Sequence, residues 1–153
     1  MLLRDYKTSD CPAMAQLFFD TVHEINAKDY IKKQLDVWAT GSVDLEEWNL
    51  SFLEHNTLVA EMDGKIAGFA DMDHTGYLDR LFVHKDYQGI GIATALVKEL
   101  ELRAKEAGIS RFETYASITA KRFFEKQGYM VEAENQVIRK GIMLVNYKML
   151  KDC

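Results

Sequence analysis

The spacing of hydrophobic and polar residues changes most clearly inside the stretch from Leu78 to Glu101. Its first part, Leu78 to Val83, is apolar at most positions and rich in β-formers, which predicts a strand that is covered on both faces. From Ile92 to Ala104 an apolar residue recurs at every fourth position, which is typical of one apolar stripe on an amphipathic helix. We therefore predict a strand and then a helix, which ends at Gly108.

The segment that joins this strand to this helix is rich in glycine and reads Gln88-Gly89-Ile90-Gly91-Ile92-Ala93. The first turn of a helix leaves about four backbone N–H groups unpaired and carries partial positive charge, so a glycine-rich entry lets a diphosphate approach the backbone. The alternative is a tight strand-to-helix turn without a ligand. The dinucleotide fingerprint fits poorly, because Thr94 stands where that pattern has Gly or Ala. The phosphate loop of nucleotide triphosphatases is excluded, because no Gly-Lys-Ser/Thr follows.

The pattern predicts further strands on both sides of this unit. Asp63-Gly64 stands between two β-rich runs and is the strongest short hairpin signal, and a loop around His74-Thr75-Gly76 then leads into the strand at Leu78. The strand from Arg111 follows a crossover helix and should run parallel to the strand at Leu78. The predicted strands are residues 2–6, 57–62, 65–70, 78–83, 111–116, 129–137 and 142–150. We expect an α/β fold, α+β in character, whose central mixed sheet of about seven strands is flanked by helices.

The helices are predicted from helical spacing and from cap residues. Thr8-Ser9-Asp10 offers caps, and Pro12, the only proline, suits the first turn of the first helix. Asp44 can cap a later helix, and Ser117 or Thr119 can cap a short one near the C-terminus. The predicted helical segments lie within residues 12–25, 30–38, 44–53, 92–107 and 120–127.

Length and composition bound the class of protein. The 153 residues suit one domain, 1–153, and no apolar run approaches the ~20 residues that cross a bilayer. Met1 to Asp5 lacks the features of a secretory signal, and Cys11 and Cys153 have no metal-ligand spacing, so both suit free thiols in a reducing cytoplasm. A net charge of −5 without a Lys/Arg cluster argues against nucleic acid and slightly favours a cationic substrate such as an amine. We expect a soluble cytoplasmic protein without a membrane partner.

The glycine segment resembles the acyl-coenzyme A signature of the GNAT superfamily of N-acetyltransferases, which reads Gln/Arg-x-x-Gly-x-Gly/Ala between a strand and a helix. Gln88, Gly91 and Ala93 match this pattern, although Lys85 stands where proline is common. The segment from Ser117 to Tyr129 is similar to a second family pattern and to a bacterial subgroup of the family. The predicted order of strands and helices is also that of the family, so the resemblance covers nearly the whole chain.

The resemblance implies direct transfer of the acetyl group of acetyl-coenzyme A to a primary amine in a ternary complex, without a metal. The partner is then a small-molecule or peptide amine, such as a polyamine, an aminoglycoside-like drug or a peptide N-terminus. A homodimer is a further expectation that the sequence leaves open. The coenzyme-binding residues implied by the family are Leu81, Phe82, Val83, Gln88, Gly89, Ile90, Gly91, Ile92, Ala93, Thr94, Ser117, Ala120, Phe123, Phe124 and Lys126.

Amine acetylation needs a base, a hydrogen-bond donor to the tetrahedral oxyanion and a proton for the departing thiolate. The implied donor is a backbone N–H near Leu81-Phe82-Val83, where the family's fourth strand leaves the fifth. Asp79 is the first candidate base, because regular alternation puts it on the same strand face as Leu81 and Val83. Asp71 and His74 are alternatives, and a carboxylate can also act through water. The other interpretation of these acids is a solvated turn residue or an ion-pair partner.

The proton source is the least defined of the three roles. Phe124 stands where the family commonly has the tyrosine that protonates the departing thiolate. A water held by Ser117 or the hydroxyl of Tyr115 could serve instead, or turnover is slow because no acid is present.

Two further expectations concern the acceptor pocket and the class of function. The family's wall region contains Tyr30, Trp38 and Trp48, with His74 as a further pocket candidate, and ordinary core packing is the alternative for each aromatic residue. Besides an N-acetyltransferase, a non-catalytic module that binds acetyl-coenzyme A as a sensor or partner protein stays open because of Phe124. An unrelated α/β binding domain is a third alternative.

Overall fold

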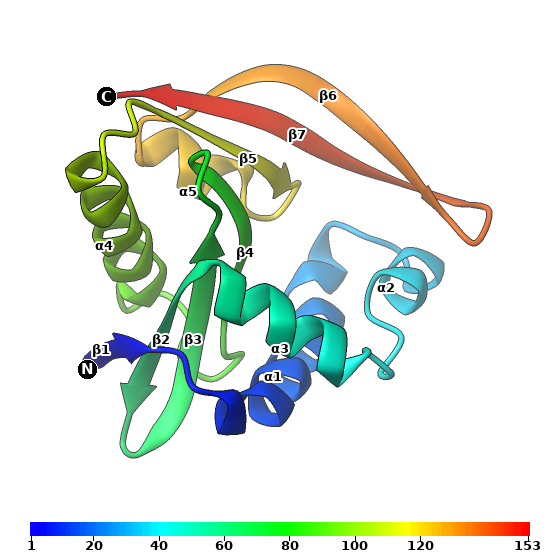
Figure 1. Ribbon diagram of the computed structural model, residues 1–153. Coiled ribbons are helices and arrows are strands. Elements are labelled where there is room, and N and C mark those ends of the chain that lie inside the picture. Colours follow the sequence, from blue (N-terminus) through cyan, green and yellow to red (C-terminus); the bar gives the residue numbers. More distant parts are fainter.

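The structure, a computed structural model that describes residues 1–153, contains one seven-stranded mixed sheet with helices on both faces (Figure 1). The strand order is β1-β2-β3-β4-β5-β7-β6. The strands are β1 (Leu2–Asp5), β2 (Asn56–Met62), β3 (Lys65–Met72), β4 (Tyr77–Val83), β5 (Arg111–Ser117), β6 (Met130–Arg139) and β7 (Ile142–Asp152). The helices are α1 (Cys11–Glu24), α2 (Lys32–Trp38), α3 (Leu45–Glu54), α4 (Ile92–Glu106) and α5 (Lys121–Lys126). None of these helices has the length and apolar character needed to cross a membrane.

The sheet is interrupted in its middle, between β4 and β5. These two strands run parallel, as predicted, whereas every other neighbouring pair is antiparallel. Their pairing covers only Tyr77 with Glu113 and Leu78 with Thr114. Beyond these two pairs of residues, β4 is hydrogen-bonded only to β3, and β5 only to β7. The sheet is therefore open toward the C-terminal ends of β4 and β5.

Two hydrophobic cores lie on opposite faces of the sheet, because side chains alternate along each strand. On β2, Leu58 and Ala60 enter the core under α4 and α5, and Val59 between them enters the core under α1, α2 and α3. The mixed sheet with helices on both faces confirms the predicted fold class (Figure 1).

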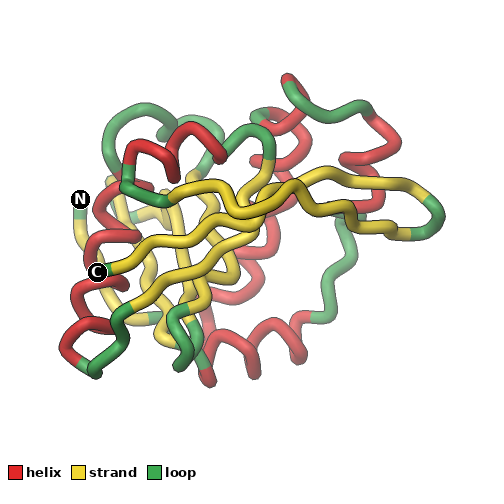
Figure 2. Tube along the Cα trace, turned by 90° about the horizontal axis from the view of Figure 1, so that it is seen from above, coloured by secondary structure: helices red, strands yellow, loops and turns green.

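Two hairpins turn through a pair of residues that both have positive φ. Asp63 (φ 52°) and Gly64 (φ 73°) join β2 to β3, and Lys140 (φ 50°) and Gly141 (φ 78°) join β6 to β7. This backbone matches the right-handed twist of the flanking strands, which is why Asp-Gly predicted the first hairpin correctly. Figure 2 shows that the β6–β7 hairpin extends beyond the rest of the sheet.

The predicted helix caps are only partly present. Asp44 caps α3 by accepting a hydrogen bond from the Glu47 N–H at 3.1 Å. Asp10 precedes α1 but makes no side-chain cap, so that expectation is wrong. Its buried carboxylate instead accepts from Arg4 Nη1 at 2.7 Å and from the Lys7 N–H at 3.0 Å. Leaving a buried carboxylate without a cationic partner costs more stability than leaving the helix without a side-chain cap.

Gly76 holds the start of β4 against β5, and its substitution tests this packing. Its φ is +95°, and a Cβ atom there would collide with the carbonyl oxygen of Arg111. We expect Gly76→Ala to lower the free energy of unfolding by more than ~2 kcal/mol, because left-handed strain of about 1–2 kcal/mol adds to this clash. The matched control is Gly64→Ala, where φ is +73° and no atom lies within 4 Å of the added Cβ. Urea unfolding compares the two variants, and equal losses would contradict the role of the contact.

Candidate active site

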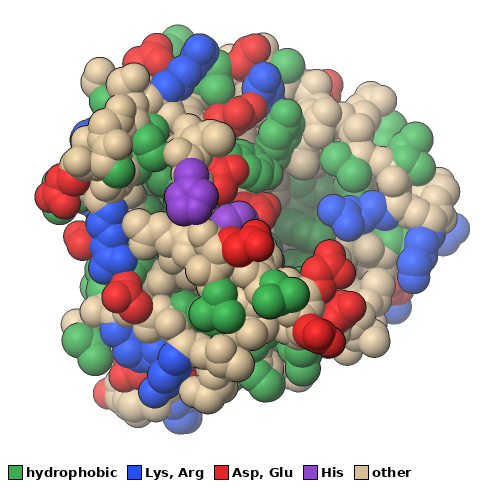
Figure 3. Space-filling view, in the orientation of Figure 1, with side chains coloured by type: hydrophobic (Ala, Val, Ile, Leu, Met, Phe, Trp, Pro, Cys, Tyr) green, Lys and Arg blue, Asp and Glu red, His purple; other side chains and the backbone are tan.

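A cleft of about 680 Å³ opens where β4 and β5 separate. Residues of α1, α2 and α3 line one side, β4 and β5 line the middle, and the β6–β7 hairpin lines the other side. Most of the lining is hydrophobic. Figure 3 shows this hollow, with hydrophobic side chains at its bottom and Lys and Arg side chains beside it.

The open edge of β4 supplies backbone groups to this cleft. The Arg80 N–H donates to Asp71 Oδ1 at 3.0 Å and the His84 N–H to the Ala67 carbonyl at 2.8 Å, so both point toward β3. Backbone groups alternate in direction along a strand, so those of Leu81 and Val83 point toward the side where β5 is absent. Their N–H groups therefore have no partner strand, whereas the N–H group of Phe82 is turned toward β3.

The glycine loop leaves the first turn of α4 open. Gly89 (φ 73°) and Gly91 (φ 93°) both have positive φ, and no atom lies within 4 Å of a Cβ added at either. Gly91 is the N-cap residue of α4, and its carbonyl accepts from the Ala95 N–H at 3.1 Å. The N–H groups before Ala95 have no acceptor inside the helix, so they form a site that favours an anion.

The Val83 carbonyl ties this loop to β4 and to α1. It accepts from Gln88 Nε2 at 2.7 Å and from Thr21 Oγ1 at 3.0 Å. The Gln88 side chain therefore holds the loop against the end of β4 and does not point freely toward a ligand.

Asp79 lies in the cleft at an irregularity of β4. Asp71 pairs with Arg80 and Met72 with Leu78, so Asp79 is the extra residue of a β-bulge. The alternation expected for Asp79 breaks there, because Leu78 and Val83 enter the same core although they are five positions apart. A β-bulge changes the direction in which a side chain points. At this bulge the Asp79 side chain lines the cleft and is 35% exposed. Burial and, next, the Asp71 carboxylate raise the pKa of Asp79.

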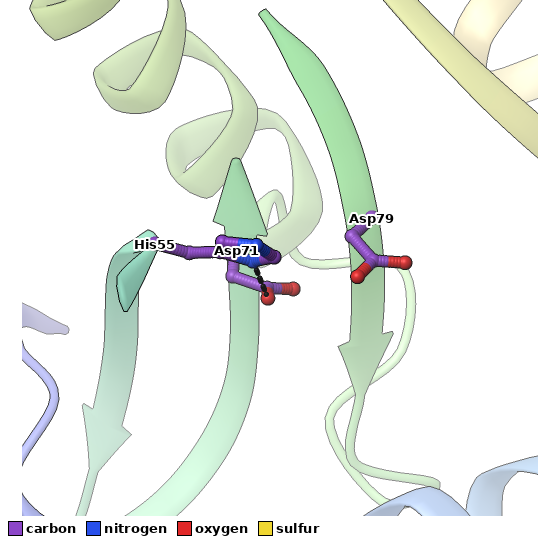
Figure 4. Close-up of side chains that lie close together, drawn as sticks. All are labelled: His55, Asp71 and Asp79. Carbon is purple, nitrogen blue, oxygen red and sulfur yellow. Dashed lines mark hydrogen bonds and ion pairs between the residues drawn. The ribbon is translucent and has the colours of Figure 1, made fainter. Parts of the chain in front are cut away.

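Asp71 does not face the cleft, which corrects its place among the candidate bases. Its side chain is fully buried and accepts from Arg80 Nη2 at 2.6 Å. It also accepts from His55 Nδ1 at 2.7 Å (Figure 4). The hydrogen bond with Asp71 raises the pKa of His55. Asp71 is therefore bound by the guanidinium of Arg80 and by the imidazole of His55, and it contacts Asp79 only indirectly, through Arg80.

Arg80 connects this group to the helical wall. Its Nη2 donates to Ser51 Oγ at 2.6 Å, lies 3.8 Å from Asp79 Oδ2, and its guanidinium stacks over Phe52 at 4.1 Å. Ligand atoms of His55, Asp71 and Asp79 lie within 4.8 Å of one another, a spacing that a metal ion could use. Arg80 already occupies both oxygens of Asp71, so a divalent cation would have to displace a guanidinium.

Aromatic residues form the helical wall of the cleft, as expected from the sequence. Tyr30, Trp38 and Trp48 all line the cleft. Tyr30 is also a structural tie, because its hydroxyl donates to the Val145 carbonyl at 2.7 Å and accepts from the Ile118 N–H at 2.9 Å. His74 lies exposed in the turn between β3 and β4 and does not line the cleft, so its assignment to the pocket is wrong.

The side of the cleft next to α5 contains Phe124 and the proposed proton sources. Phe124 is buried and lines the cleft, and it offers no proton. Ser117 lines the cleft, and its Oγ accepts from the Ala120 N–H at 3.0 Å. Tyr115 is partly exposed in the cleft and packs edge-on against Tyr77.

Several lining residues were missed at the level of the sequence, among them Tyr77, Arg139 and Lys140. Tyr77 precedes the predicted strand, and burial raises its pKa above the ordinary tyrosine value. Arg139 and Lys140 reach the cleft from the tip of the β6–β7 hairpin. They make the cleft locally richer in positive charge than the chain-wide value of −5 indicates. The nearest sequence signal was the turn Lys140-Gly141, but nothing in it shows what the hairpin covers.

Comparison with known proteins places these features in a family. The family model of the acetyltransferase (GNAT) domain matches residues 26–151. The chain is 29% identical over 148 residues to the uncharacterized N-acetyltransferase YafP of Escherichia coli strain K12, which covers 96% of this chain and 93% of that protein.

Solved structures share the whole fold. A GCN5-related N-acetyltransferase from Rhodopseudomonas palustris superposes with a TM-score of 0.95 at 32% identity, over 99% of this chain and 95% of that chain. The PaiA N-acetyltransferase from Thermoplasma acidophilum, solved in complex with coenzyme A, superposes with a TM-score of 0.82 at 18% identity, over 99% of this chain and 98% of that chain.

The pair of His55 and Asp71 predicts a pH dependence. Because the folded protein raises the pKa of His55 above its unfolded value of ~6.5, its stabilisation is complete below pH ~6.5 and is lost as pH rises through the folded pKa. We expect His55→Gln to lower the free energy of unfolding more at pH 5.5 than at pH 9. Urea titrations at both pH values measure this, with His74→Gln as the exposed control that forms no ion pair. A loss that is equal at the two pH values would contradict the charged pair.

Proposed function

Because this chain belongs to the GNAT family of acetyltransferases, we propose that residues 1–153 act as one domain that transfers the acetyl group of acetyl-coenzyme A to a primary amine. One observation carries this proposal: the cleft at the opening of the sheet is lined by a carboxylate with a raised pKa, and strand β4, which forms its middle, leads directly to the glycine loop at the N-terminus of α4. A cofactor on one side and an amine on the other can meet there directly.

The coenzyme is proposed to follow the open edge of β4 to the glycine loop. Its diphosphate takes the N–H groups from Gln88 to Thr94, where the loop leaves space and the helix carries partial positive charge. The pantetheine pairs with the backbone of Leu81 and Val83, and its thioester end lies next to Phe124. The PaiA N-acetyltransferase, which shares this fold, was solved in complex with coenzyme A, and this supports acetyl-coenzyme A as the co-substrate.

The reaction proposed is one displacement at the thioester carbonyl. The amine nitrogen attacks the carbonyl carbon while Asp79, directly or through water, takes the amine proton, and a β4 N–H stabilises the oxyanion. The C–N bond forms, the C–S bond breaks, and the departing thiolate takes a proton. Phe124 supplies none, so we propose a water held near Ser117 or the hydroxyl of Tyr115 as its source.

Family membership and the shape of the cleft support an enzyme over a non-catalytic sensor. Aromatic residues of α1, α2 and α3 line the cleft, and this space suits an acceptor, which a coenzyme sensor does not need. The two unpaired cysteines support a reducing, cytoplasmic setting.

The outer edge of β6 is free along ten residues, and we propose it as the edge at which a homodimer could pair.

The glycine loop gives a test of coenzyme binding. We expect Gly91→Trp to abolish coenzyme A binding in isothermal titration calorimetry, because the indole would fill the space above the first turn of α4. The matched control is Gly108→Trp at the other end of the same helix, where φ is +88° and a Cβ also meets no atom within 4 Å. Circular dichroism checks that both variants fold. Wild-type affinity in Gly91→Trp would contradict the anion site.

Asp79 gives a test of the chemical step. We expect Asp79→Asn to lower kcat by roughly a hundredfold or more and to leave coenzyme affinity unchanged, because a general base acts only in the reaction. The acid limb of the wild-type pH profile should lie above the ordinary carboxyl value of ~4, because the pKa of Asp79 is raised and its protonated form cannot accept a proton. Asp63→Asn, in the β2–β3 turn, is the matched control. Turnover of Asp79→Asn within a few-fold of wild type would assign the base to water.

A further inference from the structure

Two cations at the mouth of the cleft have no partner within the chain. Arg139 and Lys140 line the cleft and form no ion pair or side-chain hydrogen bond. The third basic residue of the lining, Arg80, is already paired with Asp71. Asp79 is the only acid in the lining, and it lies on β4 rather than on the hairpin.

The hairpin that carries these cations is held in place. Its strand β7 receives hydrogen bonds from the Tyr30 hydroxyl at the Val145 carbonyl (2.7 Å) and from Gln34 Nε2 at the Met143 carbonyl (3.0 Å). Leu144 is buried in the core that also contains α1, α2 and α3. The two cations are therefore positioned over the acceptor side of the cleft, away from the α4 end where the coenzyme phosphates are proposed.

We propose that the acceptor is an amino acid or a similar amine that carries a carboxylate, which Arg139 and Lys140 bind while the amine faces Asp79. The inference rests on the proposed function, because it assigns the acceptor of that same site. Two unpaired cations beside an apolar cleft favour an anion, and guanidinium binds carboxylate with two parallel hydrogen bonds. The opposed charges of the cleft, Asp79 on β4 and the cations on the hairpin, match the two charges of an amino acid.

The same charges disfavour other amines. A polyamine or an aminoglycoside-like acceptor would bring further positive groups toward Arg139 and Lys140, and like charges repel. The aromatic residues Trp38 and Trp48 also line the cleft and offer an apolar surface for the side chain of the acceptor.

The test uses the L-amino acids, their C-terminal amides and 1,5-diaminopentane as probes. Binding to the protein saturated with coenzyme A is measured by calorimetry, and turnover is measured by thiol release from acetyl-coenzyme A. We expect at least one amino acid to bind and react better than its amide, with a preference of about tenfold or more, and added salt should reduce this preference. The variants are Arg139→Gln and Lys140→Asn, of which the second suits the left-handed backbone at φ 50°.

The expected result is that the double variant loses the preference for the free carboxylate, so that an amino acid and its amide bind and react alike. The matched control, Lys65→Gln, removes a cation from the β2–β3 hairpin and should keep the preference. The inference is overturned if amides or the diamine are preferred, if no amino acid binds, or if the double variant keeps the preference. Binding of a carboxylate that depends on Arg139 and Lys140, without any thiol release, would instead support the anion site and contradict the transferase function.

Discussion

The neutralisation of one buried carboxylate organises the catalytic side of this protein. Asp71 is fully buried, and a charge in that position is stable only with close partners. Arg80 and His55 supply them, so β4 must turn the Arg80 side chain toward β3 and α3. The bulge at Asp79 accommodates this register, and the same guanidinium fixes α3 through Ser51 and Phe52. One ion pair therefore places the candidate base and the wall of the acceptor pocket together.

The opening between β4 and β5 divides the cleft into two functional sides. The α4 and α5 face offers backbone N–H groups and space, which suit an extended anionic cofactor, whereas the α1 to α3 face offers aromatic rings and charged side chains. The short parallel pairing makes this division possible, because longer pairing would satisfy the edge of β4 with β5. The proposed function depends on backbone groups that the sheet leaves without a partner.

The fold was predictable because its signals are local. Asp63-Gly64 and the period change at Gly91 each depend on neighbours in the sequence, and both agree with the structure. The candidate site was less predictable from the sequence than the fold. Asp71 and Asp79 stand at similar strand-end positions in the sequence, and only the long-range pairing with Arg80 and His55 separates a buried ion-pair partner from an exposed carboxyl. Likewise, Arg139 and Lys140 belong to an ordinary turn signal, and only the anchoring of β7 by Tyr30 brings them to the cleft.

The β6–β7 hairpin also has an evolutionary consequence. Its tip is exposed, carries little of either core, and is joined to the fold by bonds to the backbone of β7. Substitutions at such surface positions usually change stability by less than about 0.5 kcal/mol. Selection can therefore exchange residues at the tip, and with them the acceptor, without disturbing Asp79 or the glycine loop. New specificities become accessible by single mutations that the fold tolerates.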